Sequence, residues 1–549
     1  MKLKSLVIIS IFIIILSIGI VSASKNITEN NSTLNNPQTV HINGNSFNDI
    51  QKSIDNTKKD DIIELEGYFS SSRKPIIIKN DLTIQGSSKN TTLDGKKLSS
   101  IFQIKSNVIL KNLIIKNSGE SAIDFTPENY KKLTIINCTF QNNDGGEYGD
   151  GGCIFCNMGS FTIINSTFTN NNANYGGAIY SFSFNEQNKC EIINCNFKNH
   201  ENNVIYSNNK FNITNSTFEN NGVNDWSGGA IFTFADLNIT NSNFINNTGL
   251  DGGAIYLYQC NLTLNNCFFN KNTAVENGGS IYSYGILLSN DKINANVIII
   301  NSNFINSKSG KDGAIIATVF TNLTINNTEI HDSLGDNSIY IKAGIMNISN
   351  ESYIIKKIDK IKAKLQAKNF KTEYNSQKRF YVKLTDMEQG YDVSERTIKL
   401  KVFTGKRAKE YIIITYDDDI CTAELYITKE FSIGKHKVEI TSLSKYYDSK
   451  KITVYITVNK AKLTVKAPVL KTKYKKSKKF TVNIKNKNNI KLKIKVFTGK
   501  KSKTFKVRTN KKGIASINTK HLKLGHHKVK ITSLNKNYIL SKESEIIII

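Results

Sequence analysis

Three aspartates have the residue type and the spacing that could support acid–base chemistry. Asp150, Asp251 and Asp312 each stand directly before a glycine, at a similar position in a repeated unit of the sequence. Paired carboxylates of glycosidases work at separations of about 5–10 Å, whereas stacked repeats would place these three several repeats apart. Asp before Gly is also an ordinary turn choice. We therefore expect structural aspartates and predict no catalytic, cofactor-binding or metal-binding residue; a carbohydrate-active enzyme, a polysaccharide lyase or glycoside hydrolase, is the alternative.

Cysteines are the second group that could carry chemistry. Cys138, Cys195 and Cys267 occupy a position that Ser or Thr fills in other repeats, which indicates small buried side chains. Cys153 and Cys156 spell a CxxC motif, but residues three apart in a strand point to opposite faces. We therefore expect no metal or redox site at these thiols.

The elements that would hold these residues are short strands of a unit that recurs eight times. In residues 237–256, Leu237 and Ile239 alternate with polar residues, and a Gly-Gly pair precedes a second strand; this alternation predicts strands and turns. A Phe, or Ile in the last copy, marks each unit about every 27 residues: Phe140, Phe168, Phe197, Phe218, Phe244, Phe269, Phe304 and Ile330. An Asn stands three residues before each marker: Asn137, Asn165, Asn194, Asn215, Asn241, Asn266, Asn301 and Asn327. Such a period indicates a solenoid, a propeller or an array.

The strand content of the unit selects among these architectures. Each copy has short strands and no 3.6-residue periodicity, and it lacks the four longer strands of a propeller blade. One copy therefore predicts one coil of a parallel β-helix, and we expect about ten or eleven coils spaced about 4.8 Å apart. Stacked Phe and Ile would fill the interior. The Asn residues would form an amide-to-amide ladder, which would make the glycosylation sequons at Asn165 and Asn215 inaccessible. An amphipathic helix predicted over residues 46–56, with Ser46 and Asp49 at its N-cap, would cover the open end.

The N-terminal segment has the features of a secretory signal peptide. Residues 1–23 combine two early lysines, an apolar run over residues 6–20 and small residues at 21–23, the pattern of a cleaved signal. An uncleaved anchor is the alternative, although the apolar run is shorter than the roughly 20 residues of a spanning helix. Residues 24–40 are rich in Asn, Ser and Thr and predict a flexible leader.

These motifs resemble those of a known family. The runs IELEGYF, IIIKNDLTIQG and TTLDG, followed by repeated Asn-[Ser/Cys]-x-Phe and GGAIY, resemble the adhesin-like surface proteins of methanogenic archaea. The resemblance implies a right-handed parallel β-helix of the pectin-lyase-like superfamily over residues 41–355. That superfamily contains enzymes, adhesins and phage tailspikes alike, so the resemblance bears on architecture more than on biochemistry.

Near residue 355 the pattern changes to lysine-rich alternating strands that occur twice. The repeated motifs are IKLKVFTGK (398–406) with LKIKVFTGK (492–500), and GKHKVEITSL (434–443) with GHHKVKITSL (525–534). Their offset of about 91–100 residues is the size of an immunoglobulin-like sandwich, and the segments resemble bacterial-type Ig-like domains. We predict an all-β chain in which Ig-like domains over residues 356–460 and 461–549 follow the β-helix. The first contains Cys421 and His436, but such a sandwich offers no obvious cleft for a Cys/His nucleophile.

Positive charge is concentrated in the last domain. Residues 461–549 hold 26 Lys and Arg against two acids, residues 361–460 hold 20 against 13, and residues 1–360 hold 28 against 30. The densest run is KTKYKKSKKF (471–480). A field this strong attracts polyanions, and no nucleic-acid-binding motif is present. The predicted partner is a polysaccharide or cell-wall polyanion; a solvated lysine-rich surface is the alternative.

Together these features predict a secreted or cell-wall-associated adhesin-like protein, extracellular at the cell wall or surface. The β-helix would display a binding surface for glycans or other cells, with the loops 221–227 and 284–296 as its contact face. The Ig-like pair would form a stalk, and the basic C-terminal domain would hold the protein at the envelope. We expect no enzymatic activity, no cofactor, no nucleic-acid partner and no membrane span after signal removal.

Overall fold

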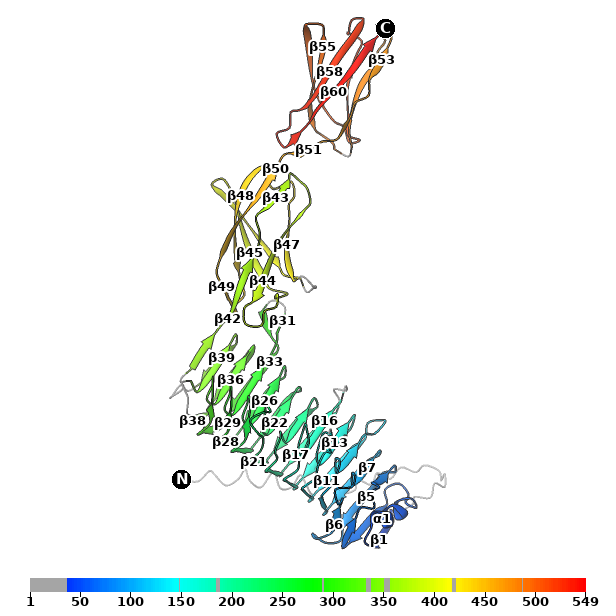
Figure 1. The fold of residues 1–549 in the computed structure, drawn as a ribbon, viewed down its shortest axis with the longest axis vertical. Coiled ribbons are helices and arrows are strands. Elements are labelled where there is room, and N and C mark those ends of the chain that lie inside the picture. The colour runs from blue at the N-terminus through cyan, green and yellow to red at the C-terminus, as the bar shows by residue number, and fades with distance from the viewer. Residues whose placement is uncertain are drawn as a thin grey trace, which may run out of the picture.

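The computed structural model describes residues 37–549 apart from 148, 184–187, 289–290, 332–336, 350–355, 417–420 and 486, without the side chains of 356 and 357. The predicted signal peptide and most of the predicted leader lie outside the described residues. Figure 1 shows a β-helix and two sandwiches that follow one another along the long axis of the molecule. The described residues contain one helix, α1 (Phe47–Ile54), and no helix long and apolar enough to cross a membrane.

Three long parallel sheets form the walls of the β-helix, and successive coils supply successive strands. The 13-stranded sheet runs from β1 (Thr39–Asn43) to β40 (Ile345–Ser349), and the 11-stranded sheet from β3 (Tyr68–Ser70) to β38 (Glu329–His331). The 12-stranded sheet consists of β4 (Ile76–Ile78), β7 (Phe102–Ile104), β10 (Ile123–Phe125), β13 (Ile154–Asn157), β16 (Ile179–Phe182), β19 (Ile205–Ser207), β22 (Ile231–Thr233), β26 (Ile255–Tyr258), β30 (Ile281–Tyr284), β36 (Ile316–Val319), β39 (Ile339–Lys342) and β41 (Lys356–Asp359). The expected ten or eleven coils are therefore slightly too few, because the less regular first and last coils also pair.

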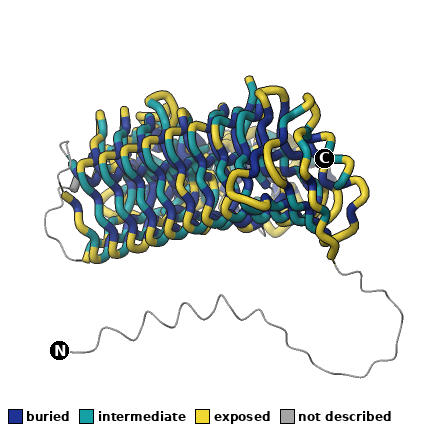
Figure 2. The backbone as a smooth tube through the Cα atoms, turned by 90° about the horizontal axis from the view of Figure 1, so that it is seen from below, coloured by how far each residue is buried: buried dark blue, intermediate teal, exposed yellow. Residues whose placement is uncertain are grey.

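Stacked phenylalanines fill the interior, as predicted. In the 11-stranded sheet Phe140 pairs in register with Phe168, and Phe269 with Phe304. The seven marker rings from Phe140 to Phe304 are buried, and neighbouring centroids lie 4.6–4.9 Å apart. Figure 2 shows the result along the whole β-helix: buried and more exposed positions alternate in every coil. One side-chain type thus repeats at one register position through seven coils.

The asparagines before each Phe lie at the surface, which the sequence did not lead us to expect. All eight have φ between 45° and 55°, the left-handed conformation that Asn tolerates best among residues with a Cβ. Amide-to-amide bonds link some neighbours, such as Asn194 Nδ2 to Asn165 Oδ1 at 3.1 Å. The prediction that these Asn side chains bond amide to amide is therefore confirmed for these neighbours. The prediction that Asn165 and Asn215 are inaccessible is wrong, because the left-handed corner leaves these residues exposed.

A second asparagine ladder, which we did not predict, lies inside the β-helix. It stands three residues after each of the six Phe markers from Phe140 to Phe269, and a His takes one of its places: Asn143, Asn171, His200, Asn221, Asn247 and Asn272, all nearly fully buried. Asn143 Nδ2 donates to Asn171 Oδ1 at 3.0 Å, and Asn221 Nδ2 donates to Asn247 Oδ1 at 3.0 Å. Buried amides need such partners. The stacked register supplies them, so the polar corner can be closed to water.

Helix α1 covers the first coil, as predicted. Ser46 Oγ accepts from the Asp49 backbone N–H at 3.4 Å, and Asp49 Oδ2 accepts from the Ser46 N–H at 3.2 Å, the reciprocal bonds of a capping box. Phe47, Ile50 and Ile54 are buried in the same hydrophobic cluster as the interior of the coils.

The two sandwiches have the same strand order in their five-stranded sheets. The first sandwich has β43 (Phe370–Glu373), β50 (Ile452–Asn459), β48 (Gly434–Ser442), β45 (Thr397–Thr404) and β46 (Arg407–Ile414). The second has β53 (Leu470–Thr472), β60 (Ser541–Ile548), β58 (Gly525–Ser533), β55 (Lys491–Thr498) and β56 (Lys501–Arg508). A second layer, centred on β44 (Arg379–Asp386) or β54 (Lys479–Ile484), faces each sheet. The predicted fold class, a right-handed parallel β-helix followed by two Ig-like sandwiches, is confirmed.

The segment 284–296 joins the β-helix to the first sandwich, so its predicted role as a contact loop is wrong. It contains the antiparallel strands β31 (Leu287–Leu288) and β32 (Lys292–Ile293). Leu287 and Ile293 are buried in the hydrophobic cluster that forms the core of the first sandwich. The apolar side chains of this hairpin are the physical reason, because they are removed from water only by docking.

A buried arginine fixes this junction. Arg396 of the first sandwich is 5% exposed and donates from Nη2 to Leu287 O at 2.6 Å and from Nη1 to Leu288 O at 2.9 Å. Asp291 of the hairpin accepts from Ser444 Oγ at 2.8 Å. Hydrogen bonds from a buried charged group are stronger than neutral ones. The β-helix and the first sandwich are therefore held by specific contacts as well as by the linking chain.

Candidate binding face

The three predicted aspartates occupy one register row, four residues before the first residue of β13, β26 and β36. Strand pairing places Asp150 and Asp251 four coils apart, but Asp251 and Asp312 only two coils apart, or about 10 Å at the spacing of strands. The expected separation of several repeats is therefore correct for Asp150 and too large for the other two.

Asn277 occupies the row between Asp251 and Asp312. Asp251 Oδ1 accepts from the Asn277 backbone N–H at 3.1 Å and from Asn277 Nδ2 at 2.9 Å, and Asn277 Oδ1 accepts from the Asp312 N–H at 3.3 Å. Burial raises the pKa of Asp150 and of Asp251. These are the bonds of turn residues that link one coil to the next. That none of the three is catalytic stays a prediction.

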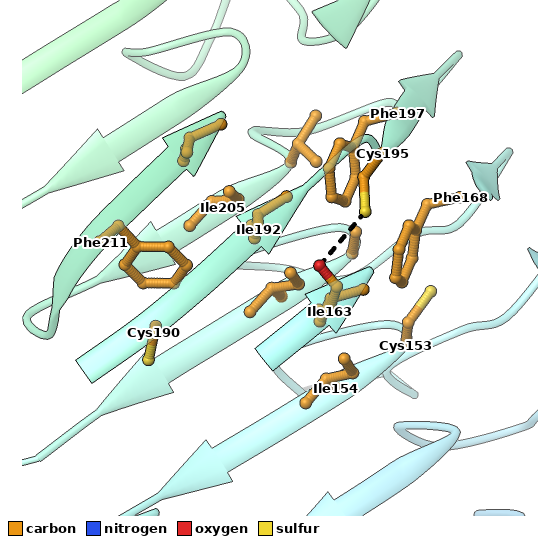
Figure 3. Packing of buried hydrophobic residues seen from close by; sticks show 14 of the residues in the cluster. Cys153, Ile154, Ile163, Phe168, Cys190, Ile192, Cys195, Phe197, Ile205 and Phe211 are labelled. Carbon is orange, nitrogen blue, oxygen red and sulfur yellow. Dashed lines mark hydrogen bonds between the residues drawn. The ribbon is translucent and has the colours of Figure 1, made fainter. Parts of the chain in front are cut away.

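The cysteines of the β-helix are enclosed by its core. Cys153 and Cys156 are both buried, so the expectation that they point to opposite faces is wrong. Cys153 lies before β13, where the chain turns at Gly151 with φ of 67°. Figure 3 shows Cys153, Cys190 and Cys195 among Phe and Ile side chains, with Cys195 Sγ donating to Ile163 O at 3.6 Å.

Burial also favours the protonated form of these thiols. It raises the pKa of Cys138, Cys156 and Cys260 to about 12. These side chains therefore remain thiols, whereas the thiolate is the form that acts as a nucleophile or binds a metal. Within the described part of the chain, no group of three His, Cys, Asp or Glu side chains is placed to hold a metal ion.

His436 has a structural role in the first sandwich. Its Nε2 lies 2.6 Å from Ser432 O and its Nδ1 lies 3.3 Å from Phe403 O. His527 makes the same contacts in the second sandwich, with Lys523 O at 2.7 Å and Phe497 O at 3.3 Å, although residues 461–549 contain no cysteine. The histidine therefore belongs to the fold and needs no Cys421 as a partner.

The feature that stands out on the β-helix surface is a row of aromatic side chains on the 12-stranded sheet. The first aromatic row is Phe155, Tyr180, Tyr206, Phe232, Tyr256 and Tyr282, one from each of six consecutive coils and each half-buried. Neighbouring ring centroids lie 4.6–5.7 Å apart. The first five rings are nearly parallel, whereas Tyr282 is tilted by 34° from Tyr256. The row is about 24 Å long at five coil steps.

A second, partial row lies two residues farther along the same strands. The second aromatic row is Phe182, Phe234, Tyr258 and Tyr284. Phe234 is 37% exposed, and its ring is turned by 73° from Tyr206 and by 67° from Tyr258. The first row presents mainly ring edges and tyrosine hydroxyls, because stacking covers the ring faces. Phe234 is not stacked in this way, so more of its ring face is open to a ligand.

Trp226 flanks the rows from the loop 221–227. It is 37% exposed, and its ring lies 4.9 Å from that of Tyr175 at 79°; Tyr175 in turn lies 4.8 Å from Tyr206. We refer to the two rows with Tyr175 and Trp226 as the aromatic face. The loop that we predicted to be a contact site therefore borders this face.

The strand alternation explains why the aromatic side chains point outward. In each GGAIY-type motif the Ile is buried and the following residue is directed away from the core. On the 13-stranded sheet, the corresponding outward row is polar in the first five of these six coils and ends on an Ile in the sixth: Thr162, Glu191, Asn212, Asn238, Thr263 and Ile298. The aromatic residues are therefore a property of one wall. The recurring Tyr or Phe after Gly-Gly-x-Ile was the signal that could have revealed them.

Polar groups border the aromatic face. A shallow hollow beside Phe234 is lined by Asn208, Lys210, Asp236 and Gln259. Burial raises the pKa of Tyr206 to about 12, with Tyr175 and Asp150 adding to the effect, and burial also raises the pKa of Tyr256 and Tyr282. These hydroxyls thus remain protonated at physiological pH. The face combines apolar ring surface, hydroxyl donors and amide and carboxylate groups.

One coil of this face matches a known repeat. Residues 165–181 match the Chlamydia polymorphic membrane protein repeat, a stretch that includes the corner Asn165, the core Phe168 and Tyr180 of the first aromatic row. The chain is also 32% identical over 181 residues to the probable autotransporter YfaL of Escherichia coli strain K12. That alignment covers 29% of this chain and 13% of the relative, so the chain spans a small part of that protein's length.

Solved structures with weak overall likeness include two bacterial proteins. The Yersinia pseudotuberculosis adhesin InvE is 12% identical, with 34% of this chain and 58% of that chain covered and a TM-score of 0.18. Invasin, described as a bacterial integrin-binding protein, is 11% identical, with coverages of 34% and 39% and a TM-score of 0.21. At these values the likeness carries no argument about function.

Proposed function

We propose that this chain is a secreted or cell-surface adhesin-like protein whose aromatic face binds glycans. The observation that carries the proposal is the outward placement of aromatic side chains on six consecutive coils of one wall, while the matching positions of the 13-stranded wall are polar in five of these coils and aromatic in none. Exposed apolar patches rimmed by polar groups mark interaction sites, and Tyr and Trp dominate binding energies at such sites. The similarity to an autotransporter segment and to a repeat of a Chlamydia membrane protein supports display at a surface.

The chemistry of the face suits a sugar better than a purely apolar ligand. A pyranose ring has apolar C–H faces and a hydroxyl rim. Phe234 and Trp226 can pack against C–H groups, because an aromatic ring offers a large, rigid apolar surface. The hollow beside Phe234 supplies Lys210 and Asp236 within the same area, which can bond to hydroxyls.

The proposal is tested by binding of the purified full chain to a glycan array at moderate salt. The matched variants are Trp226→Ala with Phe234→Ala, which remove the two most exposed rings of the face, and Tyr130→Ala, which removes an exposed ring elsewhere on the β-helix. We expect the double variant to lose at least about tenfold in affinity, the loss typical of removing aromatic anchors, and Tyr130→Ala to bind like the wild type. Absence of glycan binding, or equal binding by the double variant, would contradict the proposal.

The same samples test the enzyme alternative. New reducing ends or unsaturated uronates, lost on replacing Asp251 or Asp312 by Ala, would show a carbohydrate-active enzyme, since these two carboxylates lie about 10 Å apart, near the range of inverting glycosidases. We expect no product. In the proposal the Ig-like pair is a stalk, and the basic last sandwich holds the protein at the envelope.

A further inference from the structure

The duplicated sandwiches can be compared position by position, because their strands pair in the same register. On β45, Lys401 lies opposite Glu410 of β46 and Glu439 of β48. The matching residue of β55, Lys495, lies opposite Thr504 of β56 and Lys530 of β58. Both acids of the first sandwich are therefore absent from the second, and one of them is replaced by a cation.

The first sandwich neutralises this sheet face with its own acids. Lys399 lies 3.8 Å from Glu410, and Glu439 lies 2.6 Å from Lys437 and 3.4 Å from Lys451. Lys399, Lys437 and Lys451 thus each have a carboxylate within 4 Å. The positive charge of this sheet face is therefore largely balanced by acids of the same domain.

The second sandwich has a continuous basic surface at the same positions. We refer to it as the lysine face, and it consists of Lys491, Lys493, Lys495, Lys506, Arg508, Lys528 and Lys530. Within the described residues none of these seven forms an ion pair; the ion pair of the second sandwich joins His526 to Glu545. The acids Glu543 and Glu545 lie on β60, directly opposite Lys530 and Lys528, whereas the five cations of β55 and β56 have no acid opposite them. The face covers three strands, about 10 Å in width.

The lysine face is unfavourable to the fold. Lys493 lies directly opposite Lys506, Lys491 opposite Arg508, and Lys495 opposite Lys530, and like charges directly opposite each other destabilise a sheet. The homologous sheet of the first sandwich shows that the fold accepts Glu or Ile at these positions. An anionic ligand would offset the repulsion of these three like-charge pairs.

The run KTKYKKSKKF has a different place. Most of it lies between β53 and β54, at an end of the sandwich where the Tyr474 N–H donates to Ile549 O at 2.8 Å. The most basic stretch of sequence is therefore a loop, and the ordered cationic surface is formed by three strands from separate parts of the chain.

We propose that the lysine face is a binding site for an anionic envelope polysaccharide, a polymer with repeated carboxylate or phosphate groups. This inference deepens the retention part of the proposed function. The shape of the face favours an extended chain, because the cations are spread over a flat sheet. Within the described residues, β55, β56 and β58 expose no large apolar side chain that could enter a lipid surface. Phe497 lies beneath Lys495, and Phe505 pairs with the buried Ile494 and packs on the core side of the sheet, so neither ring is free to stack on bases.

The test uses the full chain with polygalacturonate and polyphosphate as probes and dextran as the neutral control. The variant Lys506→Glu with Lys530→Glu places one acid on each strand beside β55, and the acid at 530 takes the position of Glu439 in the first sandwich. The matched control, Lys473→Glu with Lys476→Glu, makes the same charge change in the end loop. We expect the first variant to lose at least tenfold in affinity for one or both anionic polymers and the control to lose less than threefold. We also expect wild-type binding to disappear as NaCl rises from 50 to 500 mM.

Equal losses in the two variants would overturn the inference, because binding would then follow net charge and not the face. Stronger binding to anionic lipid vesicles or to single-stranded DNA than to either polymer, lost in the Lys506→Glu, Lys530→Glu variant, would also overturn it. A gain-of-function variant, Glu410→Thr with Glu439→Lys, should give the first sandwich measurable affinity for the same polymer. Failure of this test leaves glycan binding by the aromatic face intact, since we expect Trp226→Ala with Phe234→Ala to bind polyanions normally.

Discussion

His200 is the one residue of the described inner ladder that titrates. It is 2% exposed, its Nε2 lies 3.3 Å from Asn171 Nδ2, and its Nδ1 lies 3.0 Å from Asn221 Oδ1. Asn171 donates to the ring and Asn221 accepts from it only if the proton is on Nδ1, so we assign the neutral Nδ1–H tautomer. Burial lowers the pKa of His200 to about 4. A protonated ring would present a second N–H to the Asn171 amide donor.

The stability of the β-helix should therefore depend on pH through this residue. The unfolded chain binds a proton below about 6.5, whereas the folded chain does so only below about 4. His200 thus contributes stability that is present above pH 6.5 and is lost as pH falls toward 4, on the order of 3 kcal/mol in total. His200→Asn continues the ladder without a titrating group. We expect its free energy of unfolding to fall less between pH 7.5 and pH 4.5 than that of the wild type. Denaturant unfolding at both pH values measures this, and equal pH dependence in the two proteins would contradict it.

At the residue scale, the sequence predicted which positions repeat but not which way each one faces. Asn three residues before Phe and Asn three residues after it are equally periodic, and both satisfy turn preferences. Asn165 adopts the left-handed conformation and faces water, whereas Asn171 is buried. Local propensity does not distinguish the two; burial is set by how the next coil covers each corner.

At the scale of elements, the hairpin of β31 and β32 shows that a segment predicted to be a surface loop can instead be a packed part of the fold. We predicted that this segment is part of the contact face of the β-helix. Its function in the fold depends on Arg396, more than 100 residues later in the sequence, and no local pattern connects the two. By contrast, the duplicated strands β45 and β55 were recognisable from their shared motif alone, because their sequences and their pairing partners both recur.

Removing Arg396 should loosen the junction. Arg396→Ala removes two hydrogen bonds made by a charged group, each worth about 1.5–3 kcal/mol, so we expect local opening of the hairpin to become easier by about 3 kcal/mol. The rate of trypsin cleavage after Lys292 measures this opening and should rise on the order of 100-fold.

The matched control for this prediction is Arg379→Ala on the same sandwich. Arg379 is about half exposed and pairs with Glu424 at 2.9 Å, and exposed pairs contribute less than about 1 kcal/mol. In Arg379→Ala, we expect the rate of trypsin cleavage after Lys292 to differ less than threefold from that of the wild type. Equal rates in the two variants would show that Arg396 does not hold the hairpin.

At the scale of the whole molecule, the aromatic face and the lysine face lie on different domains. The aromatic face is on the β-helix and the lysine face is on the last sandwich, and the first sandwich lies between them (Figure 1). This order suits a protein that is held at one end and presents a binding surface at the other. The sequence predicted the order of domains from repeats and charge. It did not predict either face, because each is formed by outward side chains of several strands that come together only in the fold.

The central claim is that glycans bind at the aromatic face, and Trp226 allows a direct measurement because it is the single tryptophan of the chain. Glycans that bind on the array would be titrated into the full chain while tryptophan emission is followed. The account predicts a saturable change in emission whose midpoint agrees with an independent binding assay. In Phe234→Ala, the affinity given by that midpoint should be at least about tenfold weaker. Saturable binding with no change in Trp226 emission would place the glycan elsewhere and contradict the account.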